Sequence, residues 1–145
     1  MLIKSVILTL VFLVSSLSTS NITSTYFITV EVTLKKAEGD VYLALYNKSE
    51  HFPKKGDEHI YKGTVINVVD KKVTYTFKEL PKGEYAVATY HDRNSNGQFD
   101  FNFIGWPLEG YGFSTNYKPR FSAPDFEDVS FNLEDNTLVE IKMLN

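Results

Sequence analysis

The ten residues from His91 to Asp100, HDRNSNGQFD, carry oxygen atoms at a spacing that suits a bound cation. Calcium binds six to eight oxygens, and a tight loop supplies them from alternate positions. Gly97 stands at position 6 when Asp92 is counted as position 1, and such a loop bends sharply there. The predicted metal ligands are Asp92, Asn94, Asn96, the main-chain carbonyl of Gln98, and Asp100.

This loop departs from a complete calcium loop at its twelfth position. Phe103 stands where a bidentate Glu would complete the ligand set, and Arg93 adds a positive charge. We therefore expect weak Ca²⁺ binding, on the order of 0.1–1 mM, as in extracellular modules. The alternative is a β-hairpin without metal, because Asn96-Gly97 is a preferred centre of a type I′ turn and Asp and Asn are common in loops.

A second group of candidate residues follows in GWPLEGYGF, residues 105–113. Aromatic faces between glycines can form a flat platform for a sugar, a small ligand or a peptide. The alternative is that these rings only cover one end of the domain while the glycines permit tight bends. The predicted ligand-binding residues are Trp106, Glu109, Tyr111 and Phe113.

Enzymatic activity has less support in the sequence. Glu109 together with Asp125 or Glu127 would supply the paired carboxylates of a hydrolase, but the sequence does not fix their separation. The chain has no Cys nucleophile and no Gly-x-Ser-x-Gly motif. We therefore expect a non-enzymatic module in which a calcium-type cation in the Asp/Asn loop orders the aromatic surface. The alternative is a module that binds a carbohydrate, a small ligand or a peptide through the aromatic loop without metal, and an envelope enzyme is the least favoured alternative.

The N-terminal residues 1–20 have the layout of a secretory signal peptide. Lys4 precedes an apolar run from Val6 to Val14, and small polar residues follow. That run is too short to span a bilayer, which needs about 20 apolar residues. We expect a secreted or periplasmic protein with no membrane span after cleavage. The absence of Cys excludes a lipid-bearing Cys and disulfides.

The charge of the chain argues against one class of partner, nucleic acids. The formal net charge of the whole chain is −3, whereas a nucleic-acid-binding protein needs a basic face, so no nucleic-acid partner is expected. Residues 21–145 suffice for one domain with its own core. An envelope glycan, a peptide or another protein remains as the expected partner.

Alternating apolar and polar residues predict seven strands and no amphipathic helix. The pattern is clearest from Ile28 to Lys35, and the last two strands, 128–134 and 137–144, are expected to form a hairpin. This favours an antiparallel β-sandwich, immunoglobulin-like or transthyretin-like, with a small barrel as the alternative. Region 92–128 is predicted to be a long aromatic loop, because it holds nine aromatic residues without regular alternation.

Three stretches resemble one family of exported bacterial proteins, domain of unknown function 2141. They are YLALYNKSEHF, the block FKELPKGEYAVATYHDRNSNGQFDFNFIGWPLEGYGFSTN, and PDFEDVSFNL. The resemblance implies an exported β-sandwich related in style to prealbumin-like domains, and it implies no known activity. Trp106 and Arg93 depart from the family pattern, in which a smaller apolar residue and an acidic or polar residue are more common at these two positions. The positions on its acidic-amide loop are Asp92, Asn94, Asn96, Gly97, Asp100 and Asn102.

Overall fold

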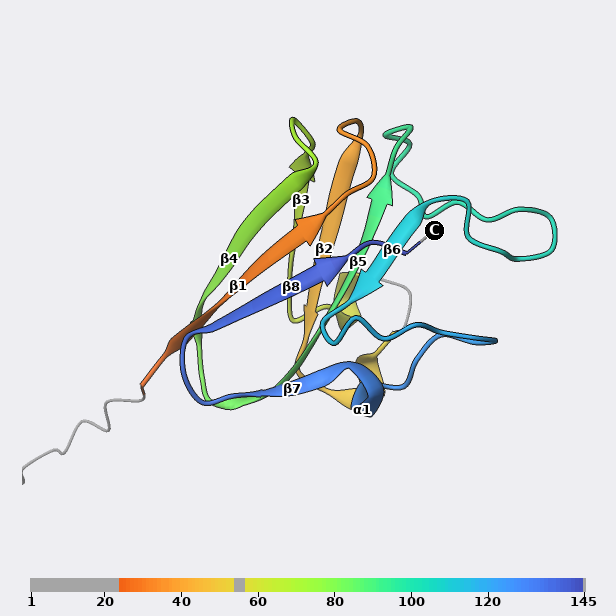
Figure 1. Cartoon of the computed structure of the whole chain (residues 1–145). Coiled ribbons are helices and arrows are strands. Elements are labelled where there is room, and N and C mark those ends of the chain that lie inside the picture. The colour runs from red at the N-terminus through yellow and green to blue at the C-terminus, as the bar shows by residue number, and fades with distance from the viewer. Residues whose placement is uncertain (1–23, 54–56, 145) are drawn as a thin grey trace, which may run out of the picture.

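A computed structural model describes residues 24–53 and 57–144, which form two β-sheets packed face to face (Figure 1). The strands are β1 (Tyr26–Thr33), β2 (Asp40–Tyr46), β3 (Lys62–Asn67), β4 (Lys72–Leu80), β5 (Gly83–Asp92), β6 (Gly110–Phe113), β7 (Ser130–Leu133) and β8 (Thr137–Lys142). The short helices are η1 (Ser49–His51), η2 (Asp57–His59) and α1 (Phe126–Val129). The expected all-β sandwich is confirmed. The proposed signal peptide lies outside the described residues.

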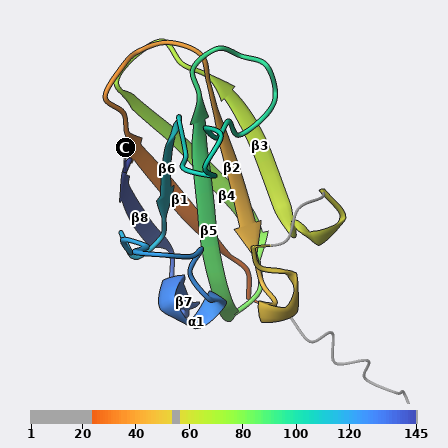
Figure 2. The ribbon, with the colours of Figure 1, turned by 90° about the vertical axis from the view of Figure 1, so that its right-hand side faces the viewer.

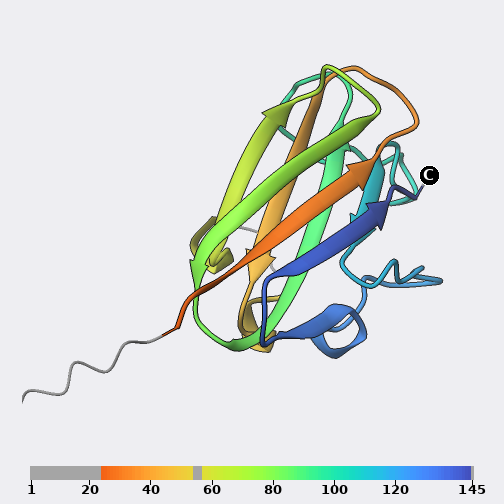
Figure 3. The ribbon, with the colours of Figure 1, turned by 60° about the vertical axis from the view of Figure 1, so that its left-hand side comes forward.

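The smaller sheet has the strand order β4-β1-β8 and the larger sheet has the order β3-β2-β5-β6. Figure 3 brings the smaller sheet forward, and Figure 2 shows the larger sheet. Strand β7 also belongs to the larger sheet, because it pairs with residues 83–86 of β5 while β6 pairs with residues 88–91. All pairings are antiparallel except β1 with β8, which is parallel.

The core lies between the sheets and follows from the period-two pattern. Ile28, Val30 and Val32 of β1 are fully buried and alternate with more exposed residues. Val87 of β5 and Leu43 of β2 meet them from the larger sheet within the same core cluster. Alternation thus decides which face of each strand enters the core, as the sequence predicted for β1.

Two expectations about topology are wrong. Strands β7 and β8 do not form a hairpin: β7 joins the larger sheet and β8 joins the smaller one. The turn between them therefore carries the chain across the sandwich. The expected long loop also contains a strand, β6, which sequence alternation missed because Gly110 and Gly112 occupy its inward-facing positions.

Glycine is required at position 112 by the close approach of the smaller sheet. A Cβ atom there would lie 2.5 Å from Ile141 Cγ2, and Ile141 is almost fully buried. On the same side, Tyr111 N donates to Leu144 O at 3.2 Å and Leu144 N donates to Tyr111 O at 2.7 Å. These main-chain hydrogen bonds fasten β6 of the larger sheet to the segment that follows β8 in the smaller sheet.

Candidate functional site

Asp92 ends β5 and is fully buried. Its Oδ1 accepts a hydrogen bond from Asn96 N at 3.2 Å, and its Oδ2 accepts one from Gly97 N at 2.7 Å. A buried carboxylate must find such donors, because desolvation without them is costly. Asp92 therefore fixes the first half of the loop by its two main-chain hydrogen bonds.

Glu109 performs the same task from the other end of the loop. It immediately precedes β6 and is 3% exposed. Its Oε1 accepts from Arg93 N at 2.9 Å and its Oε2 accepts from Asp100 N at 3.2 Å. The Arg93 guanidinium in turn donates to Leu108 O at 2.9 Å. One buried carboxylate thus ties the beginning and the end of the Asp/Asn loop to the start of β6.

Asp100 lies opposite two amide side chains in the same loop. Asn94 Nδ2 donates to its Oδ2 at 2.9 Å, and Asn96 Nδ2 donates to the same atom at 3.1 Å. The Asn94 Oδ1 accepts from Asn96 N at 3.1 Å, and the Asn96 Oδ1 accepts from Gln98 N at 2.8 Å. The structure therefore brings three of the five predicted ligand residues into contact, with the Asn94 and Asn96 amide nitrogens turned toward Asp100. The oxygens of Asp92 instead face main-chain N–H groups of the same loop.

The arrangement restricts which atoms could hold a cation. Within the residues that the structure describes, no three side chains of the His, Cys, Asp and Glu types are grouped to bind a metal. A cation in this loop would therefore depend on amide and main-chain oxygens beside the carboxylates. Rotation of the Asn94 and Asn96 amides would present their oxygens to the same space that their nitrogens now face.

The hairpin alternative with a type I′ turn at Asn96-Gly97 is wrong. That turn needs positive φ at both central residues. In the described loop, φ is positive at Ser95 (54°) and Gly97 (77°), and Asn96 is not among the positive-φ residues. The segment after the loop also does not return along β5, whose edge at residues 88–91 is occupied by β6.

The turn between β1 and β2 packs against the start of the Asp/Asn loop. Gly39 has φ +73°, and a Cβ atom there would lie 2.1 Å from the carbonyl oxygen of Asp92. His91 Nε2 lies 2.6 Å from Glu38 O in the same turn. Hydrogen bonds from the side chains of Ser95 and, to a smaller extent, Asn67 lower the pKa of the Asp40 carboxyl. The loop is therefore anchored to β2 as well as to β5.

Beyond the loop, a second turn presents Trp106. Asn102 Oδ1 accepts from Ile104 N at 3.0 Å and from Trp106 N at 2.9 Å, while Asn102 N donates to Trp106 O. A β-bridge between Phe101 and Pro107 closes the base of this turn. Figure 1 shows that this segment projects from the sandwich next to β6. Trp106 in this turn is 61% exposed.

A groove of about 250 Å³ lies between this projecting turn and residues 119–123. Three of the four predicted ligand-binding residues, Trp106, Tyr111 and Phe113, line it. Glu109 does not: it is buried, and both of its oxygens hold the loop, so the structure gives it a supporting role. The other lining residues are Phe99, Phe101, Gly105, Pro107, Pro119, Arg120, Phe121, Ser122 and Ala123.

The floor of the groove continues an array of aromatic rings on the outer face of the larger sheet. Tyr42 and Tyr90, which are paired across β2 and β5, stack with centroids 4.5 Å apart. Phe99 contacts Tyr90 at 5.3 Å and Tyr111 at 6.0 Å, and Tyr111 contacts Phe113 at 6.0 Å. Because these rings pack against each other, the lower wall of the groove is a fixed surface.

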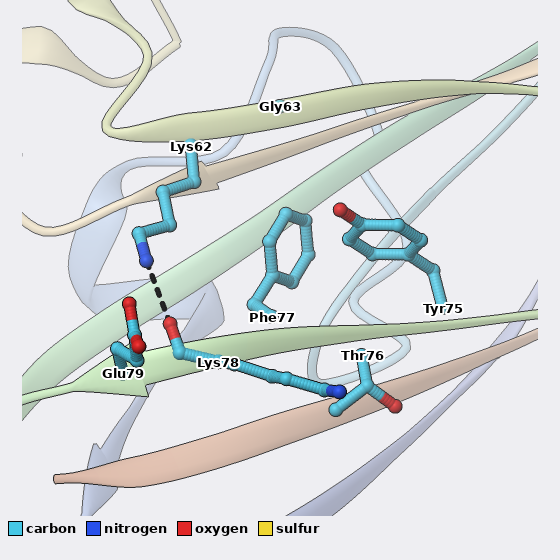
Figure 4. A pocket seen from close by; sticks show the side chains of 7 residues that line it. All are labelled: Lys62, Gly63, Tyr75, Thr76, Phe77, Lys78 and Glu79. Atoms are coloured by element: carbon cyan, nitrogen blue, oxygen red, sulfur yellow. Dashed lines mark hydrogen bonds between the residues drawn. The ribbon is translucent and has the colours of Figure 1, made fainter.

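A second cleft, of about 600 Å³, lies elsewhere, between the edge strands β3 and β4 (Figure 4). Lys62 Nζ donates to Lys78 O at 2.6 Å across it. Figure 4 shows Phe77 and Tyr75 on its wall beside the two lysines. None of the predicted site residues lines this cleft.

Sequence reasoning missed Arg120 and Phe121 as parts of the site. Both lie in the segment 119–123, which forms the far wall of the groove. The available signal was a basic residue between a proline and an aromatic residue, inside a stretch already marked as rich in aromatic side chains. Nothing in the alternation pattern could place that segment opposite Trp106.

We predict that Asp92→Asn lowers the free energy of unfolding by about 1–3 kcal/mol, because the new amide nitrogen would face a main-chain N–H of the loop and leave it without an acceptor. Urea denaturation measures the change. Asp135→Asn is the control: Asp135 is exposed in the turn before β8, and we expect a change within about 0.5 kcal/mol. Equal effects of the two substitutions would contradict the role assigned to Asp92.

Comparison with known proteins identifies a family without assigning a role. Residues 28–141 match the family model described as uncharacterized protein conserved in bacteria, DUF2141. Neither the curated proteins nor the solved structures include a significant match. The matched range covers the sandwich from β1 to β8, together with the Asp/Asn loop and the groove. The chain therefore belongs to the DUF2141 family of bacterial proteins.

Proposed function

We propose that this protein is a non-enzymatic binding module that holds a ligand with a flat or apolar part in the aromatic groove. The observation that carries the proposal is the groove itself, in which Trp106 and Phe121 stand on opposite segments above a floor that includes Tyr111. Ligand sites are typically concave and lined mainly by apolar and aromatic side chains. The Asp/Asn loop positions one wall, and β6 supplies part of the floor.

The exposure of large apolar side chains around the groove supports this proposal. Phe121 is fully exposed and Trp106 is 61% exposed, although burial of either large apolar side chain would stabilise the folded protein. Contiguous exposed apolar surface in a folded protein commonly marks an interaction site. The exposed large apolar residues of this region are Phe101, Phe103, Ile104, Trp106, Leu108, Tyr117 and Phe121.

The placement of the acidic residues supports a non-enzymatic role. Glu109 precedes Gly110, which pairs with His91 near the end of β5, and both of its oxygens accept main-chain hydrogen bonds. Asp125 is the N-cap of α1 and Glu127 lies within it. This helix leads into β7, which pairs with residues 83–86 at the beginning of β5. This geometry does not favour a catalytic pair formed from Glu109 and these acids.

We predict that small aromatic compounds shift the ¹H–¹⁵N signals of the groove residues, and that Trp106→Ala weakens the best binder by about tenfold or more, because a central aromatic contact is lost. Titration followed by NMR measures both. Phe103→Ala is the matched control: it removes an aromatic ring of the same turn that is 99% exposed and outside the groove lining. Shifts confined to the Lys62 cleft would contradict the proposal.

A second proposed function is weak binding of a calcium-type cation by the loop 92–100. It is supported by the convergence of two amide side chains on one carboxylate: Asn94 Nδ2 lies 2.9 Å and Asn96 Nδ2 lies 3.3 Å from an oxygen of Asp100. All three carry oxygens of the type that Ca²⁺ prefers. A cation there would replace the amide-to-carboxylate hydrogen bonds and would stiffen the loop at the base of the groove.

We predict that Ca²⁺ at about ten times its dissociation constant raises the melting temperature by about 5 °C, since binding at that ratio contributes about 1.4 kcal/mol. Thermal unfolding in chelator, in Ca²⁺ and in Mg²⁺ measures this. The shift should vanish in Asp100→Asn and persist in Asp135→Asn. Asp100 is a better position than Asp92 for this test, because Asp92 also holds the main chain of the loop. A substitution at Asp92 would therefore lower stability even if no ion binds. The absence of a Ca²⁺ shift would leave the loop as a hydrogen-bonded turn.

We also propose export to the periplasm or the medium. Support comes from the signal-peptide layout of residues 1–20 and from membership of a bacterial family. No helix within the described ranges is long and apolar enough to cross a membrane. Expression in a bacterial host should yield a protein that lacks about 20 N-terminal residues, as measured by intact mass. Recovery of the full-length chain from the cytoplasm would contradict this proposal.

A further inference from the structure

We infer that the ligand of the aromatic groove is an anion, a small molecule with a planar apolar ring system and one carboxylate or similar acidic group, and that Arg120 is its counter-charge. This inference rests on the proposed binding function and adds the chemical class of the ligand. Arg120 is the only charged residue among those that line the groove, so one wall of an otherwise apolar site carries a cation.

Arg120 is not engaged elsewhere in the part of the chain that the structure describes. Among residues 24–53 and 57–144, it has no hydrogen bond, ion pair or ring contact. By contrast, the guanidinium of Arg93, at the opposite end of the same region, donates a hydrogen bond to Leu108 O. A guanidinium can bind a carboxylate through two parallel hydrogen bonds, which fix the orientation of the ligand as well as adding affinity.

The apolar lining distinguishes this ligand class from neutral sugars. A sugar needs several hydrogen-bond partners for its hydroxyl groups in addition to an aromatic face, because unpaired polar groups are costly to desolvate. Beside Arg120, the groove offers the indole N–H of Trp106, the Tyr111 hydroxyl and the Ser122 hydroxyl as polar side-chain groups, and the remaining lining side chains are apolar. The rings of Phe101, Trp106 and Phe121 favour a flat hydrocarbon body instead.

The volume of the groove limits the size of the ligand, and the net charge of the protein bears on how an anion would be selected. A volume of about 250 Å³ lies just below the 300–1,000 Å³ of typical ligand pockets, which favours a body of one or two fused rings. The formal net charge of −3 means that the protein as a whole repels anions. Selectivity for an anion would therefore have to come from the groove itself.

A pair of ligands that differ only in charge tests this inference. 2-Naphthoate carries a carboxylate on a two-ring body, and 2-naphthamide has the same body with a neutral group. Isothermal titration calorimetry of the purified protein should show naphthoate binding about tenfold or more tightly than naphthamide at low salt. The difference should shrink as salt is added, because charges at an exposed groove are screened.

Three variants assign the difference to Arg120. Arg120→Gln should lower the affinity for naphthoate to that for naphthamide and leave the affinity for naphthamide unchanged. Arg120→Lys should retain part of the preference for naphthoate over naphthamide. Lys118→Gln removes a neighbouring exposed charge that does not line the groove, and it should leave both affinities unchanged. Because Arg120 is exposed and unpaired, circular dichroism should show the same folded spectrum for every variant.

The outcomes separate this inference from the binding function on which it rests. Equal affinities for the two compounds, both weakened in Trp106→Ala, would overturn the inference and leave the groove as a site for neutral apolar ligands. A preference for naphthoate that survives Arg120→Gln would also overturn it. Binding of neither compound, together with groove-localised shifts caused by a neutral oligosaccharide, would overturn it in favour of sugar. Absence of any groove-localised shift would overturn both.

Discussion

Two buried carboxylates hold the functional end of this molecule in place. Asp92 and Glu109 each accept two main-chain hydrogen bonds, and the four donors all lie between residues 93 and 100. Because a buried carboxylate without donors is strongly unfavourable, these hydrogen bonds leave the loop few alternative conformations. The end of β5, the Asp/Asn loop and the start of β6 therefore form one unit, and the turn that carries Trp106 extends from it.

Aromatic packing extends this unit across the outer face of the larger sheet. Phe99 follows the loop and packs against both Tyr90 of β5 and Tyr111 of β6, which are paired across the two strands. At the opposite end of the array, Phe52 contacts Phe113 with centroids 6.3 Å apart. The inward face of the same sheet is occupied by the aliphatic core, so the sheet separates two packed layers. The groove lies where the outer layer ends and its last rings remain exposed.

Acidic residues of similar type have different tasks because their surroundings differ. Asp92 is completely buried and supports the main chain, whereas Asp100 is partly exposed and faces amide side chains that can rotate. Glu109, which the sequence placed with the ligand-binding residues, has the same supporting task as Asp92. A cation would thus meet a loop whose shape is already fixed at both ends, and it would act mainly on the side chains between them.

The sequence alone determined the strands other than β6, the sandwich class and the chemical character of the loop, because alternation and local residue spacing are short-range properties. It also predicted that Asn94, Asn96 and Asp100 lie together, since the seven residues from Asn94 to Asp100 cannot separate far within one loop. It could not place β7 and β8 in different sheets, nor bring Arg120 and Phe121 opposite Trp106. Those placements depend on contacts between segments distant in the chain, and only the packing of the two sheets against each other decides them.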